Sequence, residues 1–222
     1  SSFGIALTSG DWNADGKIDL AVGAYGYSSN RGRIYMYTFN DGVVTGEATS
    51  NNFGYAMTSG DFNADGKTDL AVGARGYSSN AGRTYIFYND GSIPTTAATA
   101  DVIITGEASS FLGSAIVSGD FNADGKTDLA VGAYAYSSNT GRAYIFYNDG
   151  SIPTTAATAD VIITGETTNN YFGISLTSGD FNADGKTDLA VGSYGYSSSV
   201  GRTYILYNDG SIPTTAATAD VI

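Results

Sequence analysis

The stretch Asp11-Trp12-Asn13-Ala14-Asp15-Gly16-Lys17-Ile18-Asp19 returns three more times with its acidic spacing intact, in copies that begin at Asp61, Asp120 and Asp180. Each copy reads Asp-x-Asn-x-Asp-Gly-x-x-Asp, with side-chain oxygens at positions 1, 3, 5 and 9 and a backbone carbonyl at position 7. Calcium binds about six to eight hard oxygen ligands in a tolerant geometry. The pattern therefore predicts one calcium-binding loop in each copy, with about four bound ions in all.

Two other interpretations of this loop are weaker. An EF-hand needs a bidentate Glu at position 12 and flanking helices, but position 12 is Val22, Val72, Val131 or Val191. An ordinary turn also favours Asp, Asn and Gly. However, three carboxylates in one short loop repel one another unless a cation is bound. The apolar run after each loop, such as Asp19-Leu20-Ala21-Val22-Gly23-Ala24, is typical of a buried strand, so each loop is expected to connect two β-strands.

The net charge of −12 is mostly carried by these loops. Twelve of the 22 acidic residues stand at loop positions 1, 5 and 9, and all four Lys stand at position 7. Four bound Ca²⁺ ions would cancel the loop charge of −8 that results. An acidic surface also argues against nucleic-acid binding, because that depends on Lys and Arg contacts to phosphates.

Composition indicates a globular chain. The 222 residues are 42% hydrophobic and 14% charged, and no apolar run approaches the length of a membrane span. We therefore expect no membrane insertion. Cys is absent, so the redox compartment is not readable. Loops that bind calcium weakly are most useful where calcium is near millimolar, so we expect an extracellular, secreted or cell-surface location.

The whole chain is an internal repeat with units at about 1–50, 51–108, 109–167 and 168–222. Candidate strands in the first unit are Ile5 to Thr8, Asp19 to Ala24, Arg33 to Phe39, and Val43 to Thr45; later equivalents include Thr84 to Tyr88 and Val102 to Thr105. Four short antiparallel strands per unit of this length are typical of β-propeller blades. The predicted fold is all-β, with four four-stranded blades in this chain.

The units also resemble the FG-GAP repeat of integrin α-subunit β-propellers and related bacterial surface proteins. Each unit has Phe3-Gly4 or its counterpart, then the acidic loop, then Val-Gly-Ala or Val-Gly-Ser. The chain departs from this pattern at Leu112, which replaces Phe, and at Tyr25, Arg75, Tyr134 and Tyr194, which replace the Pro of Gly-Ala-Pro.

The resemblance implies an extracellular propeller that holds calcium between the first and second strand of each blade. The ligands it implies, with Lys acting through its carbonyl, are Asp11, Asn13, Asp15, Lys17 and Asp19; Asp61, Asn63, Asp65, Lys67 and Asp69; Asp120, Asn122, Asp124, Lys126 and Asp128; and Asp180, Asn182, Asp184, Lys186 and Asp188.

Propellers of this family usually close with more blades than this chain has. Three assemblies therefore stay open: a self-closed four-bladed ring, a ring completed by a second copy, and a segment of a longer array. The sequence weakly favours self-association.

For function, the sequence indicates a non-catalytic adhesion or recognition scaffold. It has no His or Cys, and no nucleophile and base form a recognisable set. A protein or glycan ligand is expected on the loop after the second strand, where aromatic residues recur: Tyr25, Tyr27, Arg75, Tyr77, Tyr134, Tyr136, Tyr194 and Tyr196. The alternatives are a carbohydrate-binding lectin, a structural or fibre-forming repeat whose blades pair between chains, and the plain packing of these Tyr residues between blades.

Overall fold

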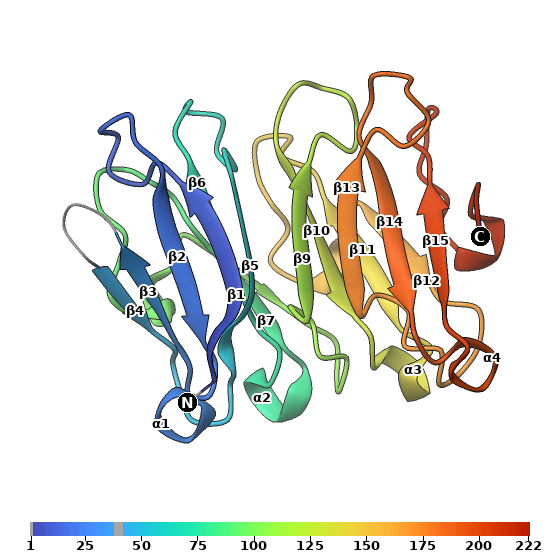
Figure 1. Cartoon of the computed structure of the whole chain (residues 1–222), viewed down its shortest axis with the longest axis horizontal. Helices are drawn as coiled ribbons and strands as arrows, with labels where there is room; N and C mark the ends of the chain where they lie inside the picture. Colours follow the sequence, from blue (N-terminus) through green and yellow to red (C-terminus); the bar gives the residue numbers. More distant parts are fainter. Residues whose placement is uncertain (1, 38–41) are drawn as a thin grey trace.

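A computed structural model of the chain describes residues 2–37 and 42–222 as a row of antiparallel β-sheets (Figure 1). The first sheet contains β1 (Phe3–Gly10), β2 (Asp19–Ala24), β3 (Arg33–Tyr37) and β4 (Gly42–Thr45). The second contains β5 (Phe53–Gly60), β6 (Asp69–Ala74), β7 (Arg83–Phe87) and β8 (Val102–Thr105). The third contains β9 (Ala115–Gly119), β10 (Asp128–Ala133), β11 (Arg142–Phe146) and β12 (Val161–Thr164). The fourth contains β13 (Ser175–Gly179), β14 (Asp188–Ser193) and β15 (Arg202–Leu206).

The prediction of four-stranded antiparallel units is confirmed for three sheets, and the fourth has three strands. In the fourth sheet, Val221 pairs with Ile205 through an isolated antiparallel bridge, in the place that a fourth strand takes in the other sheets. The expected strand from Arg33 to Phe39 is β3 as far as Tyr37, and its last two residues lie outside the described residues. The strand expected at Thr84 to Tyr88 is β7, which ends at Phe87 because the Tyr88 N–H donates to the Asp101 carboxylate.

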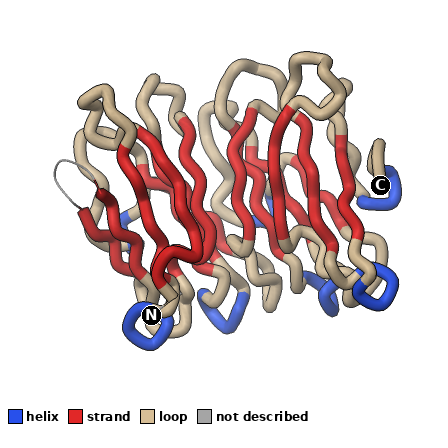
Figure 2. Tube along the Cα trace, viewed as in Figure 1, coloured by secondary structure: helices blue, strands red, loops and turns tan. Residues whose placement is uncertain are grey.

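Short helical turns cap the sheets, mostly at one end (Figure 2). The turns that follow the second strand of each sheet are α1 (Tyr27–Asn30), α2 (Tyr77–Asn80), α3 (Tyr136–Asn139) and α4 (Tyr196–Ser199). Single 3₁₀ turns lie in the Pro-containing segments that follow the third strand of the second, third and fourth units, at η1 (Ala97–Thr99), η2 (Ala156–Thr158) and η3 (Ala216–Thr218). The loop predicted after the second strand of each unit thus contains one of the short helical turns α1 to α4.

The α1 turn and its equivalents are left-handed, which is unusual for residues other than Gly. Ser28, Ser29 and Asn30 have φ values of 47°, 56° and 60°. Left-handed backbone costs an L-residue about 1–2 kcal/mol. The carbonyls of this turn accept hydrogen bonds from the next unit, at 2.9 Å from the Ser50 N–H to Ser29 and at 2.7 Å from the Asn52 N–H to Asn30. Contacts between units therefore hold the turn in this conformation.

The sheets pack face to face along the row. Strand β1 contacts β5, β5 contacts β9, and β9 contacts β13. The first and fourth sheets stand at opposite ends of the row (Figure 1). The described residues thus form a row of propeller-like blades, and no closed ring is found among them.

The hydrophobic core lies between sheets rather than within any one of them. Three buried clusters occupy the three junctions, and each combines residues from two neighbouring units. In the first junction, Ile34 and Met36 of one unit pack with Phe53, Leu70 and other residues of the next. A single sheet therefore buries its apolar residues only through its neighbours.

Two motif glycines meet at every junction. Gly73, in the Val-Gly-Ala of the second unit, lies against the backbone of Gly113, in the Leu-Gly of the third. Gly23 and Gly132 approach Gly54 and Gly173 in the same way. A Cβ on Gly73 would overlap the Gly113 carbonyl oxygen. This close approach gives a physical reason for both glycines of the motif.

Gly73→Ala is therefore expected to destabilise the chain by about 1–3 kcal/mol, because the second and third sheets must move apart. The control is Gly42→Ala, since among the described residues a Cβ there meets only the Met36 side chain, at ordinary contact distance. Urea unfolding of both variants checks this. Equal midpoints for Gly73→Ala and wild type would contradict the proposed packing.

Candidate metal-binding loops and ligand face

The four acidic loops connect β1 to β2, β5 to β6, β9 to β10 and β13 to β14. They lie at the end of the sheets opposite to the turns α1 to α4 (Figure 1). The sequence thus correctly placed each loop between two strands. All four loops lie on one side of the row.

Backbone N–H groups fix the carboxylates inside each loop. In the second loop, the Asp61 carboxylate accepts from the N–H groups of Asp65 and Gly66 at 3.0 and 2.8 Å. Asn63 Oδ1 also accepts from the Asp65 N–H at 3.0 Å, and the Asp65 carboxylate accepts from the Lys67 N–H at 2.9 Å. The other three loops repeat these bonds. The loops therefore share one conformation.

The Asp at position 9 is buried in every loop: Asp19, Asp69, Asp128 and Asp188. Asp69 Oδ2 accepts from the Phe62 N–H at 2.8 Å and Oδ1 accepts from the Asn89 N–H at 2.8 Å. Burial, with smaller contributions from the nearby carboxylates of Asp65 and Asp61, raises the pKa of Asp69 to about 6, although these hydrogen bonds lower it. Asp128 has the same environment, and its pKa is also raised to about 6, mainly by burial.

A buried Asn, which was not singled out in the sequence, couples the second acidic loop to the first and the third to the second. The Asn89 N–H binds the Asp69 carboxylate, while its side-chain amide donates to the Asp11 carbonyl of the preceding loop at 3.3 Å. Asn148 makes the same pair of contacts to Asp128 and Asp61, at 2.8 and 3.5 Å. The signal was present as the Tyr-Asn-Asp-Gly that recurs after the third strand.

The chemistry of the loop oxygens fits a hard divalent cation. Each loop offers carboxylate, amide and backbone carbonyl oxygens, and an ionised carboxylate has about four acceptor sites, so one hydrogen bond leaves others free. In residues 2–37 and 42–222, however, no three acidic side chains are grouped as a metal site. The loops thus have suitable ligands held in place by the backbone, but their acidic groups do not converge.

At the opposite end of the sheets, one series of predicted ligand residues stacks on arginine. The guanidinium groups of Arg33, Arg83, Arg142 and Arg202 lie 3.5–3.8 Å from the ring centroids of Tyr27, Tyr77, Tyr136 and Tyr196, respectively. Such cation–π contacts contribute about 0.5–2 kcal/mol each. One face of each ring is therefore already occupied by its own unit.

Three of these arginines, Arg83, Arg142 and Arg202, also join neighbouring units. Arg142 donates to the Glu107 carboxylate of the preceding segment at 2.9 Å, and the buried Tyr144 hydroxyl binds the same carboxylate. Arg83 and Tyr85 bind Glu47, and Arg202 binds Glu166 at 3.0 Å. Burial and the nearby Glu107 carboxylate raise the pKa of Tyr144, so its hydroxyl stays protonated. These Glu residues were not singled out in the sequence.

The other predicted ligand residues, Tyr25, Arg75, Tyr134 and Tyr194, lie in a row across all four units. Three residues that were not singled out in the sequence, Tyr55, Phe111 and Tyr171, complete this row, and the seven together are here called the aromatic ladder. Tyr25 and Tyr55 rings lie 5.2 Å apart, and Arg75 lies 3.7 Å from the Tyr55 ring. Tyr171 and Tyr194 stack at 4.6 Å. The ladder combines packing between units with exposed ring surface, because Tyr194 is 51% exposed.

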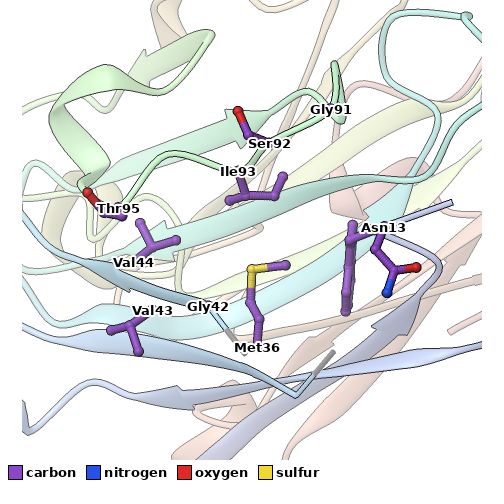
Figure 3. Close-up of a pocket in the computed structure, with 10 residues that line it drawn as sticks. Asn13, Met36, Gly42, Val43, Val44, Gly91, Ser92, Ile93 and Thr95 are labelled. Atoms are coloured by element: carbon purple, nitrogen blue, oxygen red, sulfur yellow. The ribbon is translucent and has the colours of Figure 1, made fainter. Parts of the chain in front are cut away.

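A separate cleft lies between the first two units (Figure 3). Met36, Val43 and Val44 line one side, and residues such as Ile93 and Thr95 line the other. None of its described lining residues is charged. Its described lining combines apolar side chains with polar ones such as Asn13 and Ser92.

Comparison with known proteins establishes the family. The FG-GAP repeat model matches residues 3–37, 53–87, 112–146 and 172–206, so the chain belongs to the FG-GAP repeat family. The matched residues include the Phe-Gly or Leu-Gly motif, the acidic loop and the first three strands of each unit.

Relatives share this repeat over part of their length. Human phosphatidylinositol-glycan-specific phospholipase D is 40% identical over 105 residues, which are 43% of this chain and 12% of that protein. Integrin alpha-PS5 of Drosophila melanogaster is 36% identical over 107 residues, covering 46% of this chain and 10% of that protein. The crystal structure of the V. cholerae biofilm matrix protein Bap1 aligns with 96% of this chain and 39% of its own, at 13% identity and a TM-score of 0.34. No helix among the described residues has both the length and the apolar character needed to cross a membrane.

Glu107→Ala is expected to destabilise the chain by about 1–3 kcal/mol, because it leaves the Tyr144 hydroxyl and Arg142 without their shared acceptor. Glu107→Gln keeps an acceptor and is expected to lose less. Thermal unfolding at neutral pH compares the two. An alanine variant as stable as wild type would show that this contact does not hold the units together.

Proposed function

We propose that this chain is a calcium-stabilised, non-catalytic recognition scaffold that acts outside the cell. The observation that carries the proposal is the acidic loop, present four times on one side of the sheets with the same internal hydrogen bonds. A loop needed only as a turn does not require three carboxylates that repel one another. Bound calcium would neutralise that charge.

The residues that would hold each ion are the loop oxygens. In the third loop these are the side chains of Asp120, Asn122, Asp124 and Asp128 and the carbonyl of Lys126, with the other loops equivalent. The ion would supply structural charge compensation. Because Asp128 also binds Asn148, which reaches the Asp61 carbonyl, occupancy of one loop would be felt at the junction with the preceding unit.

The extracellular location follows from the calcium proposal. A dissociation constant on the order of 0.1 mM suits extracellular calcium modules. At about 1 mM calcium, each such site would stabilise the folded chain by about 1.4 kcal/mol. Cytoplasmic calcium is far too low for such a site to fill. The absence of His and Cys from the sequence supports a scaffold without catalysis.

The ligand face is proposed to be the aromatic ladder, at the end of the sheets away from the acidic loops. Aromatic rings with polar hydroxyl groups bind protein and sugar surfaces well. The nearly parallel stacking of Tyr171 and Tyr194, at an interplanar angle of 14°, supports a rigid platform. Calcium on one side would then stabilise a ligand surface on the other.

A carbohydrate-binding function is the second candidate, and the regular ladder favours it. Rings repeated along four units would meet successive sugars of one glycan and would gain from avidity. A protein ligand would use the same face without that periodicity.

The calcium proposal is tested by isothermal titration and thermal unfolding. Wild type is expected to bind about four Ca²⁺ ions and to melt at a higher temperature in millimolar calcium than in excess chelator. Asp124→Ala should lose about one site and about 1.4 kcal/mol of the calcium-dependent stabilisation. Asp149→Ala removes the same charge from an exposed position outside the loops and should keep all sites.

A wild-type melting temperature that is the same in calcium and in chelator would contradict the proposal. An equal shift produced by magnesium would point to charge screening rather than a calcium site.

The ligand face is tested on a glycan array with Tyr194→Ala and Tyr37→Ala. The two side chains have matched exposure, 51% and 50%, but only Tyr194 belongs to the ladder. Loss of one stacking ring is expected to weaken glycan binding at least about tenfold, from about 1.4 kcal/mol of lost contact. If Tyr194→Ala and Tyr37→Ala weaken glycan binding to the same extent, the ligand does not bind at the aromatic ladder.

A further inference from the structure

The first sheet has one uncovered apolar face, here called the leading face: Phe3, Ile5, Leu7, Ile18 and Leu20. These side chains are between 41% and 75% exposed. In the second unit, the matching Phe53, Met57 and Leu70 are 8% exposed or less, because the first unit covers them. Among the described residues, nothing covers the leading face of the first unit.

Among the described residues, nothing covers the opposite side of the fourth sheet, here called the trailing face, where Phe181, Thr203 and Ile205 are exposed or half-buried around the buried Ala190. Phe181 is 42% exposed, whereas Phe62 and Phe121 at the same position are each 1% exposed beneath the following unit. The two uncovered faces lie at opposite ends of the row (Figure 1).

The two faces match the halves of junctions that already exist in the chain. The trailing face of the fourth unit carries the same residue types as that of the second, which has Phe62, Ala71, Thr84 and Ile86. The main contact positions Phe3, Leu7 and Leu20 are the same types as Phe172, Leu176 and Leu189, which pack on the third unit. Both halves are thus residue sets that already pack in this protein.

The glycines at the two faces are open in the same way. Gly54, Gly113 and Gly173 each touch the backbone of the preceding unit, but Gly4 has no atom within 4 Å of where its Cβ would be. Gly32, Gly82 and Gly141 each lie against the backbone of the next unit, but Gly201 meets only atoms of its own unit at 3.7 Å or more. Both ends of the row therefore present glycines that are free to make the close backbone contact found at each internal junction.

We propose that the leading face of one chain docks on the trailing face of a second copy, head to tail, and so repeats the internal junction between chains. The contact is heterologous, because it joins two different surfaces, and it closes into a ring if the rotation per unit allows or continues as a filament if it does not. The partner is of this repeat type because, at each internal junction, glycines let the two backbones approach so closely that a Cβ would not fit. Such a contact needs glycines at the same positions in both partners.

The test is sedimentation velocity of the 222-residue chain over a wide concentration range, with calcium present throughout. Wild type is expected to associate as concentration rises. Leu7→Asp on the leading face and Phe181→Asp on the trailing face should each weaken association at least about tenfold, since each places a charge in a dry contact. Ala157→Asp adds the same charge on an exposed turn of the third unit and should associate like wild type.

Mixing the two disabled variants gives the decisive result. Leu7→Asp keeps an intact trailing face and Phe181→Asp keeps an intact leading face, so an equal mixture should form a one-to-one dimer and stop there. Circular dichroism of each variant checks that it is folded, as expected for positions exposed in the single chain. Wild type that stays monomeric at every concentration overturns the proposal, as does a mixture of folded variants that stays monomeric. Association that survives in each variant alone would show non-specific adhesion of apolar surface and would also overturn it.

Discussion

The contact between neighbouring sheets is the interaction on which this structure depends. A four-stranded sheet of these short strands has apolar residues on both faces and no helix to cover either. Each sheet therefore buries its core only against the next sheet, in clusters such as the one that joins Ile34 and Met36 to Phe53. The close approach is possible because glycine faces glycine, as at Gly73 and Gly113. The motif glycines and the repeat architecture have the same physical cause.

Polar contacts reinforce this junction at both of its ends. Near the acidic loops, Asn89 joins the Asp69 carboxylate to the carbonyl of Asp11 in the preceding unit. Near the helical turns, Glu107 binds Arg142 and Tyr144 across the next junction. The carbonyl groups of the left-handed turns also accept hydrogen bonds from backbone N–H groups of the segment that follows, such as that of Asn52. A proposed calcium site and a proposed ligand face thus stand at the two ends of the same junctions, which would link ion binding to the geometry of the ladder.

Much of this arrangement was predictable from sequence because the repeat makes local patterns reinforce one another. The acidic loop, the apolar second strand and the number of units were readable from the repeated sequence alone. What sequence could not give were the contacts between units. Nothing local says that Glu107 meets Arg142, or that Tyr171 stacks on Tyr194, because these pairs depend on how one sheet lies on the next. Left-handed backbone at Ser28 and Ser29 was equally unpredictable, since neither residue favours it and contacts from the next unit hold it.

The central claim, that stability comes from junctions rather than from single sheets, is tested most directly by native-state hydrogen exchange. Ala21, Ala71 and Ala130 occupy equivalent positions on the central strands β2, β6 and β10. The second and third sheets are covered on both faces, whereas the first is covered on one. At a concentration low enough to keep chains apart, the Ala71 and Ala130 amides should open with a clearly higher free energy than the Ala21 amide. Equal protection at all three positions, or the highest at Ala21, would contradict the account.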